Sequence, residues 1–320
     1  MVNKKINIQD LTQLPGVGAG TSDKLKENGY MNLMAIAATT PGQLKEAAGV
    51  TEKASRKMIN LARELCELGF ELGIDIEKKR LEVRDKIPTG CEVVDELLGG
   101  GLELGTSLEA FGEFASGKTQ IGHLLAVNTL KKYPKSYVIW IDTENTFCPD
   151  RIRHFCEGSE VDPELVLSHI KVSKALSSDH QMLLTEKVEK EINDGNDVKL
   201  LIIDSLMNHF RAEYLGRGTL ANRQQTLNGY LHKVGKLCDM YGVGVYLTNQ
   251  VQADPGLAFG DPTKAIGGNI VGHFATIRVY IRKAAKGARK MLLVDSPNLP
   301  PGDATFTIEK TKLGSVETKE

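Results

Sequence analysis

Cysteine is scarce in this sequence, and what there is lies scattered. None of the five cysteines forms a CxxC pair or stands at the spacing of a metal finger. We therefore expect free thiols in a reducing compartment. No apolar run reaches the roughly 18 residues that a membrane span requires, and the first residues, MVNKKINIQD, contain no apolar signal core. These absences predict a cytoplasmic protein with no membrane partner.

Net charge is nearly absent too. Forty Lys and Arg residues oppose 41 Asp and Glu residues, so the formal net charge is −1. Counterion release needs clustered Lys and Arg, so any nucleic-acid surface must be a local patch. A composition of 41% hydrophobic and 25% charged residues excludes disorder, collagen and a coiled coil. At 320 residues, the chain has room for two domains.

Residues 11–70 contain two similar halves that are rich in helix formers. Each half begins with a turn that contains glycine, at 14–18 and at 48–50. A Thr or Ser N-cap follows, with Thr21 and Thr51 as the first candidates, and an amphipathic helix comes after it. Such a helix-hairpin-helix pattern exposes backbone N–H groups that can hold a phosphate without reading a base. The pattern favours contact with the DNA backbone. The alternative is a small helical bundle that only docks onto partners.

A charged segment, residues 71–86, follows this region and predicts a linker. Phe70 and Gly73 stand at its start. An aromatic residue at this position is either a core residue of the first domain or an anchor for another subunit.

From residue 87 onward the pattern alternates strands with helices. Strands are predicted over 107–111, 137–142, 199–204 and 242–249, and helices over 120–131, 180–193 and 220–241. Further strands near 276–283, 290–295 and 304–309 have no helices between them. The pattern predicts an α/β fold with a mainly parallel sheet and antiparallel strands at its C-terminal edge.

One loop of this region matches the GxxxxGK[ST] pattern in full. It lies between a predicted strand and a predicted helix, which is the context that makes the pattern specific for phosphate. Lys118 is expected to reach the β- and γ-phosphates of ATP, and the Thr119 hydroxyl to bind Mg²⁺. The residues expected to hold the nucleotide are Gly112, Glu113, Phe114, Ala115, Ser116, Gly117, Lys118, Thr119 and Gln120.

Polar side chains end three other predicted strands. Asp204 closes the strand LLIID and is expected to hold Mg²⁺ through water, while Glu144 follows the strand YVIWID. Gln250 ends a third strand, where its amide can bond a γ-phosphate oxygen. Because the carboxyl ends of parallel strands meet at one edge of the sheet, we expect these groups beside the phosphate loop. Taken alone, Glu144 is equally a surface acid; in this setting it is expected to deprotonate the attacking water, acting with Lys118 and Gln250 as a catalytic residue.

Two segments are candidate functional loops. Residues 210–218 carry Arg211 and Arg217, with Arg223 at the start of the next helix, and arginine on a glycine-containing loop suits phosphate binding. Residues 251–268 form a long segment rich in Gly and Pro, and loops of this length without structure are usually functional or disordered. On charge alone, the arginines of the first segment are equally solvated loop residues.

A basic run follows at residues 278–290. It contains no acid and six basic side chains, namely Arg278, Arg282, Lys283, Lys286, Arg289 and Lys290. A solvated hairpin is one explanation. Since the candidate DNA loops lie nearby in sequence, a second surface for duplex DNA is the other.

Together these motifs resemble the archaeal branch of the RecA-like strand-exchange family. The similarity runs in family order from about residue 10 to 310 and is carried by LPGVG, GFELGID, GEFASGKTQ, IDTENTF, LLIIDS, HFRAEYLGRGTLANRQQ, LTNQV, AIGGNIVGH and VDSPNLP. It implies a helix-hairpin-helix domain over 1–69, a linker with a polymerisation motif over 70–86, and a RecA-like P-loop ATPase domain over 87–320.

The resemblance also implies roles by position. Phe70, with Gly73, would insert into the neighbouring subunit, Arg151 would pack on the adenine, and Asp295 would cap the ATP of the adjacent subunit. The implied DNA contacts are Arg211, Arg217, Arg223, Gly267 and Gly268.

Several residues depart from the family's pattern. Cys148 stands where Arg is common, Asn269 replaces the usual His, and Met207 and Asn208 replace small hydroxyl residues. Two further departures are at positions where glycine is usual. Ala115 lies in the phosphate loop, where bacterial relatives have Ser, so a Cβ is expected to fit. Asn145 follows the catalytic glutamate, and Asn tolerates a left-handed backbone better than most residues do.

We therefore expect a DNA repair and recombination protein: a DNA-dependent ATPase that forms filaments on single-stranded DNA and catalyses homologous pairing and strand exchange. Its implied partners are single- and double-stranded DNA, further copies of itself in a helical filament or a ring, and mediator proteins that the sequence does not identify. One alternative is a RecA-like helicase or regulatory ATPase, although no helicase-specific element is visible. Another is a recombination mediator that binds DNA without strand exchange; such paralogues often lack the hairpin domain or the assembly aromatic, and this chain has both.

Overall fold

The chain divides into two compact units, Met1–Val83 and Arg84–Glu320. The computed structural model describes residues 10–83, 85–253 and 263–316. The first unit ends with the helix α5 (Gly73–Val83), so most of the segment expected to be a linker is helical. Its run of Lys, Arg and Glu is as typical of a solvated helix as of a linker, which is why charge alone could not separate the two.

The first unit is a bundle of short, capped helices. Besides α5 it contains η1 (Leu11–Gln13), α1 (Ala19–Glu27), α2 (Leu33–Ala37), α3 (Pro41–Ala48) and α4 (Glu52–Leu65). Thr40 and Gln43 form a reciprocal capping box on α3. The Thr51 hydroxyl accepts the Ala54 N–H at 3.3 Å and starts α4, which confirms the predicted cap.

The predicted cap at Thr21 is wrong. Helix α1 begins two residues earlier, at Ala19, and its N-cap is Gly18, which makes no side-chain hydrogen bond. A Cβ built at Gly18 or Gly20 would meet nothing within 4 Å. The first N–H groups of α1 have no intrahelical acceptor, so this turn presents donors on an open surface, as the hairpin pattern requires.

The second unit is built around a nine-stranded sheet of order β13-β12-β11-β10-β3-β7-β6-β4-β5. Its strands are β3 (Ser107–Gly112), β4 (Tyr137–Asp142), β5 (Ile170–Lys174), β6 (Val198–Asp204), β7 (Gly244–Asn249), β10 (Ile277–Lys283), β11 (Arg289–Asp295), β12 (Asp303–Ile308) and β13 (Leu313–Ser315). The strands from β5 to β10 in this order are parallel, and β11, β12 and β13 are antiparallel additions. The predicted α/β class and its antiparallel C-terminal edge are confirmed.

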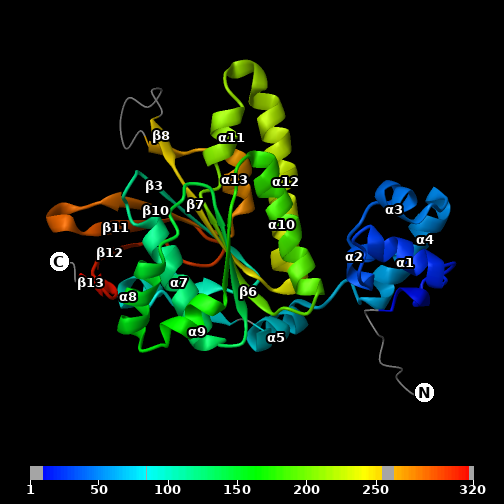
Figure 1. Ribbon diagram of the computed structural model, residues 1–320, viewed down its shortest axis with the longest axis horizontal. Helices are drawn as coiled ribbons and strands as arrows, with labels where there is room; N and C mark the ends of the chain where they lie inside the picture. The colour runs from blue at the N-terminus through cyan, green and yellow to red at the C-terminus, as the bar shows by residue number, and fades with distance from the viewer. Residues whose placement is uncertain (1–9, 84, 254–262, 317–320) are drawn as a thin grey trace. The chain divides into compact units, whose positions relative to one another are not determined.

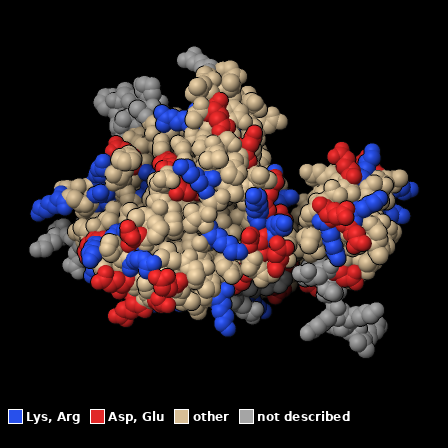
Figure 2. All heavy atoms as spheres, in the orientation of Figure 1, with Lys and Arg blue, Asp and Glu red and all other residues tan. Residues whose placement is uncertain are grey.

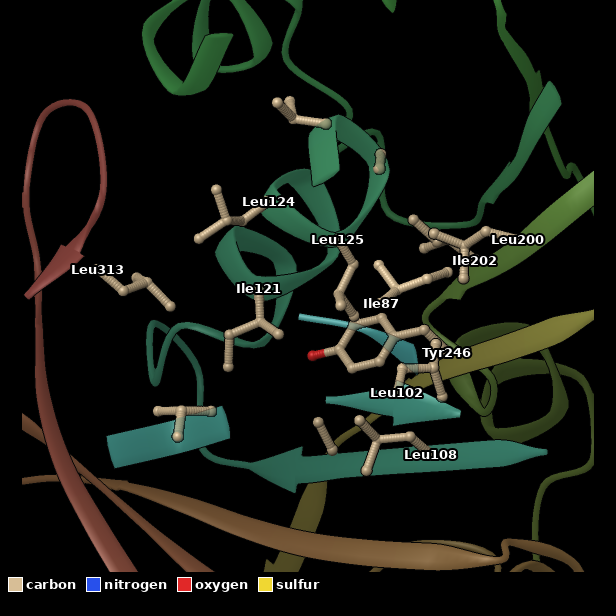
Figure 3. Packing of buried hydrophobic residues seen from close by; sticks show 14 of the residues in the cluster. Ile87, Leu102, Leu108, Ile121, Leu124, Leu125, Leu200, Ile202, Tyr246 and Leu313 are labelled. Atoms are coloured by element: carbon tan, nitrogen blue, oxygen red, sulfur yellow. The ribbon is translucent and has the colours of Figure 1, made fainter. Parts of the chain in front are cut away.

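Helices cover both faces of this sheet (Figure 1). On one side lie α7 (Lys118–Lys132), α8 (Pro149–Ser159) and α9 (Pro163–Ser168), and on the other α10 (Ser178–Asn193), α11 (Asn208–Glu213), α12 (Leu220–Tyr241) and α13 (Asn269–Phe274). Figure 3 shows Leu125 of α7 packed against Tyr246 of β7. A second cluster, with Tyr230 and Leu247, fills the opposite face. The unit also contains the pair β1 (Lys86–Ile87) and β2 (Leu102–Glu103), the helix α6 (Glu92–Leu97) and the short turn η3 (Ala285–Gly287).

Sequence patterns missed some elements of this unit. The edge strand β5, with the sequence IKVSK, alternates buried and solvated residues and is short, so it lacks the continuous apolar run of its neighbours. The segment 210–218 is not a simple loop, because it contains the end of α11 and the turn η2 (Arg217–Thr219). Within 251–268, the strands β8 (Val251–Ala253) and β9 (Thr263–Ala265) form an antiparallel ribbon, and residues 254–262 lie outside the described part of the chain.

Across the ranges that the structure describes, no helix is both long enough and apolar enough to cross a membrane.

Candidate active site

The carboxyl ends of β3, β4, β6 and β7 open into one cleft of about 530 Å³. Residues 114–120 of the phosphate loop line it, together with Glu144, Asp204 and Gln250. These groups follow four separate strands and lie up to 136 residues apart in sequence, and the parallel sheet brings them to one edge as expected.

The phosphate loop requires its two outer glycines. A Cβ at Gly112 would lie 2.1 Å from the Ile281 carbonyl oxygen, and Gly117 has φ +106° where it caps α7. Ala115 lies between them and has φ +60°. The loop therefore holds a Cβ at this position, but the residue must adopt the left-handed conformation that L-residues disfavour. Backbone N–H groups of a glycine-containing loop that leads into a helix N-terminus, here that of α7, can bind phosphate oxygens.

The Lys118 side chain folds over the loop it belongs to. Its Nζ donates to the carbonyl oxygens of Gly112 at 2.9 Å and Glu113 at 2.8 Å. Burial lowers the pKa of the Lys118 ammonium, and the carboxylates of Asp204 and Glu144 oppose that shift. The ammonium is thus held at the position from which it can bind terminal phosphate oxygens.

Asp204 is a buried carboxylate surrounded by hydroxyl groups. Its Oδ2 accepts from Thr119 at 2.8 Å and from Thr146 at 2.7 Å, while Thr248 donates to Oδ1. Burial raises the pKa of Asp204, and these hydrogen bonds act in the opposite direction. Sequence reasoning missed Thr146 and Thr248, although both stand beside strand ends that carry predicted site residues.

Glu144 is held by two donors. Its Oε1 accepts from Ser205 Oγ at 2.5 Å and from Gln250 Nε2 at 2.7 Å. Ser205 is itself fixed by Thr143, whose Oγ1 accepts the Ser205 N–H at 2.8 Å. The predicted base and the predicted γ-phosphate sensor therefore contact each other directly, and Ser205, which the sequence did not single out, bonds the same carboxylate oxygen.

One carboxylate shapes the loop that carries Glu144. Asp142, the last residue of β4, accepts the backbone N–H groups of Glu144, Thr146 and Phe147 at 3.1, 3.1 and 3.0 Å. Asn145 has φ +60°, the left-handed conformation expected from its replacement of glycine. The strand-end acid in YVIWID was visible in the sequence, but its structural role was not.

A buried histidine ties this loop to the phosphate-loop helix. His123 Nε2 accepts the Cys148 N–H at 3.0 Å, so Nδ1 carries the proton and donates to the Thr119 carbonyl oxygen at 2.9 Å. Its ring lies 4.6 Å from the ring of Trp140, measured between centroids. Burial lowers the pKa of His123 to about 4, which keeps the imidazole neutral. Cys148 is exposed at the N-cap of α8.

Two residues that the family resemblance places near the nucleotide do not line the cleft. Arg151 of α8 donates to Gln120 and to the Glu309 carbonyl oxygen at 2.7 Å, and its guanidinium lies 3.9 Å from the centroid of the Phe155 ring. Asp295, at the end of β11, is exposed. Arg151 therefore contacts the cleft only through Gln120, which does line it.

The candidate DNA residues occupy different elements. Arg211 is exposed on α11, Arg217 lies in η2, and Arg223 lies near the start of α12 with its buried Nε unpartnered. Gly268 is exposed and caps α13. Gly267 is buried, and a Cβ there would lie 2.4 Å from Val271 Cγ2, so its glycine is required by packing.

The basic run 278–290 does not form one surface. Arg278 pairs with the buried Glu109 at 2.7 Å, Lys290 pairs with Asp303 at 3.0 Å, and Arg289 lines the nucleotide cleft. The residues that remain exposed are Arg282, Lys283 and Lys286. Figure 2 shows basic side chains at the left of the view, where the β10–β11 hairpin ends in Figure 1.

Phe70 is fully exposed, and it belongs to neither the core of the first unit nor a cluster next to it. The interpretation of Phe70 as a core residue is therefore wrong. It lines an open groove of the first unit with Leu68 and Leu72, both of them also exposed.

A metal ion in this cleft would depend on the nucleotide. In the described part of the chain, no group of three or more His, Cys, Asp or Glu side chains is arranged to hold one. Thr119 and Asp204 supply hard oxygen atoms beside the phosphate loop, which fits Mg²⁺ bound jointly with phosphate oxygens.

Comparison with known proteins agrees with this geometry. The Rad51 family model matches residues 79–316, and a model of the SAM-like helix-hairpin-helix tandem matches residues 8–64. The "DNA repair and recombination protein RadA" of Methanocorpusculum labreanum is 48% identical, over 94% of this chain and 97% of its own. The protein of the same name from Methanoculleus marisnigri is 47% identical, over 95% and 98%. With the phosphate loop, the strand-end acids and the hairpin domain all in their expected order, this chain belongs to the Rad51 family.

Proposed function

We propose that this Rad51-family recombinase and DNA-dependent ATPase forms an ATP-dependent filament on single-stranded DNA and catalyses homologous pairing and strand exchange. The observation that carries the proposal is the single cleft in which Lys118, Thr119, Glu144, Asp204 and Gln250 meet. Strand exchange replaces one duplex by another of similar stability, so ATP is needed to set the state of the filament and hydrolysis to release the DNA.

In this proposal the phosphate loop and Lys118 bind the β- and γ-phosphates, with Gln120 at the side of the cleft. Arg151, which fixes Gln120, forms part of the adenine site. Thr119 would hold Mg²⁺ directly and Asp204 would hold it through water; a bound ion would supply positive charge beside the phosphates. The hydrogen bond between Thr119 and Asp204, at 2.8 Å, keeps these two oxygens together.

Glu144 is the general base. It accepts a proton from water as the water oxygen bonds to the γ-phosphorus and the bond from that phosphorus to the bridging oxygen of ADP breaks. Ser205 and Gln250 hold the carboxylate before the reaction. Gln250 also reports the γ-phosphate to the β8–β9 ribbon, because its side chain bonds Glu144 and its backbone leads directly into β8.

Single-stranded DNA is bound by Arg211, Arg217 and Arg223 and by the segment that ends at Gly267 and Gly268. Arginine gives bidentate contacts to phosphate. The exposed turn of α1 in the first unit holds a further stretch of DNA backbone through its N–H groups. Both single- and double-stranded DNA are partners, together with mediator proteins.

The active form is a homo-oligomer, either a helical filament or a ring. Phe70, fully exposed beside Gly73, is the anchor that enters the next subunit. Asp295 is exposed on the second unit and caps the nucleotide of the adjacent subunit, which explains why it does not line its own cleft.

Hydrolysis of ATP with and without single-stranded DNA tests the proposal, with the same preparation imaged by negative-stain microscopy. We expect strong stimulation by DNA together with helical filaments, followed by strand exchange between homologous oligonucleotides. Hydrolysis that is indifferent to DNA, with only rings or monomers, would favour a RecA-like mediator or regulatory ATPase instead.

A further inference from the structure

An ion pair between a buried glutamate and a partly buried arginine joins two neighbouring strands in the middle of the main sheet. The Glu109 side chain, on β3, is fully buried, and Arg278 stands opposite it in the parallel register of β10. Arg278 Nε donates to Glu109 Oε2 at 2.7 Å, and its guanidinium lies 5.2 Å from the Phe111 ring centroid. A buried pair of this kind is weak support for stability, because desolvation offsets its attraction. Its place in the sheet therefore calls for another explanation.

The second oxygen of Glu109 holds a buried amide. Asn249, the last residue of β7, donates from Nδ2 to Glu109 Oε1 at 2.7 Å. The same Nδ2 donates to the Ile266 carbonyl oxygen at 2.6 Å, and Oδ1 accepts the Gln250 N–H at 2.8 Å. Both amide hydrogens and the amide oxygen of Asn249 are thus engaged, and its orientation is fixed.

These contacts clamp the base of the β8–β9 ribbon. Gln250 precedes the ribbon and Ile266 follows it, and Ile266 N–H donates to the Gln250 carbonyl oxygen at 3.0 Å. The first pair of the ribbon, Val251 with Ala265, is the next pair along the two strands. One side chain, Asn249, therefore bonds both ends of the ribbon, while the Gln250 side chain lies 2.7 Å from Glu144.

We propose that Glu109, Arg278 and Asn249 form a positioning network that couples the β8–β9 ribbon to the ATP site. Glu109 orients Asn249, and Asn249 keeps the ribbon base in register with Gln250. Displacement of the ribbon by DNA then moves Gln250 relative to Glu144. This inference rests on the proposed function, since it takes the ribbon to be part of a DNA-binding segment.

Two double variants isolate the acceptor for Asn249. Glu109→Gln with Arg278→Met removes both charges but leaves a side-chain oxygen for Asn249; Glu109→Leu with Arg278→Met removes the charges and the acceptor. Neither leaves an unpaired buried charge. Asn249→Ala, which keeps the ion pair, is a third variant in case the leucine variant does not fold. For each we would measure melting temperature, affinity for a fluorescent ADP, and kcat and KM for ATP with and without single-stranded DNA.

We expect the glutamine variant to retain stimulation by DNA. The leucine variant and Asn249→Ala should lose at least tenfold of the ratio of stimulated to basal kcat, with ADP affinity and basal KM within about twofold of wild type. The ratio of single-stranded DNA affinity with a non-hydrolysable ATP analogue to that with ADP should fall in parallel, because coupling is reciprocal.

Equal stimulation in all variants would overturn the network, and so would equal loss in the glutamine and leucine variants, which would trace the effect to charge rather than to Asn249. An unstimulated wild-type chain would instead overturn the proposed function, and this inference with it.

Discussion

At the scale of the residue, Ala115 holds a conformation that its own Cβ disfavours. Its φ of +60° lies in the left-handed region, which costs an L-residue about 1–2 kcal/mol relative to glycine. Glycine also raises the entropy of the unfolded chain, which lowers the free energy of unfolding by about 0.4–1 kcal/mol. Ala115→Gly should therefore stabilise the second unit by about 0.5–1 kcal/mol in urea unfolding. Asn145→Gly is the matched control, and because Asn tolerates this region its effect should be smaller.

Glu144 is the residue whose replacement should separate binding from turnover. Glu144→Gln keeps the size of the side chain and an oxygen that can accept from Ser205 or Gln250, but it cannot take a proton from water. We expect kcat to fall by about 10²- to 10⁴-fold, while affinity for a non-hydrolysable ATP analogue changes little. Turnover close to wild type would show that another group is the base.

Arg289 and Lys286 test how the basic run is divided. Arg289 lines the nucleotide cleft and its buried Nε has no partner, whereas Lys286 is exposed. Loss of a charge-assisted hydrogen bond should weaken ATP binding by about 10- to 100-fold in Arg289→Ala. Lys286→Ala should leave ATP affinity unchanged, and equal effects of the two in a titration with labelled nucleotide would contradict the assignment.

At the scale of the element, His123 makes the joint between α7 and the loop before α8 sensitive to pH. Its pKa falls from 6.5 in the unfolded chain to about 4 in the fold, so the unfolded state binds the extra proton between these values. The stability that this shift represents is present above pH 6.5 and is lost as the pH falls toward 4. Between pH 7 and pH 5 the loss should be about 2 kcal/mol.

His123→Gln is the control for this effect, because an amide can replace both hydrogen bonds without titrating. Urea unfolding at the two pH values should show a smaller loss in His123→Gln than in wild type. If the two proteins lose the same stability, the pH dependence arises elsewhere.

The elements also show which parts of the structure were predictable from sequence. The phosphate loop and the ends of β4, β6 and β7 were predictable, because apolar runs and their polar ends are local signals. The β8–β9 ribbon was missed, because each of its strands is only three residues long and the two are separated in sequence by nine residues without a strand pattern. The ion pair of Arg278 could not be predicted either, because its partner Glu109 lies 169 residues away in sequence. Charge counts along the chain carry no information on such contacts.

At the scale of the whole molecule, assembly should depend on Phe70. Removing the exposed ring in Phe70→Ala should convert filaments to small oligomers or monomers in light scattering, without lowering the melting temperature, because the ring makes no contribution to the core. Phe70→Leu keeps part of the apolar volume and should assemble to an intermediate extent. Unaltered filaments in Phe70→Ala would mean that a different surface joins the subunits.

The distribution of thiols has a practical consequence for following such assemblies. Cys91, Cys156 and Cys238 are buried, and burial raises the pKa of each, to about 11 for Cys156 and about 12 for Cys238. Cys148 is exposed where the loop that carries Glu144 joins α8. Maleimide dyes react through the thiolate, so the unmodified chain offers an attachment point for a fluorophore near its nucleotide cleft. The competing thiol is Cys66 of the first unit, which is half-buried and whose pKa is raised by burial.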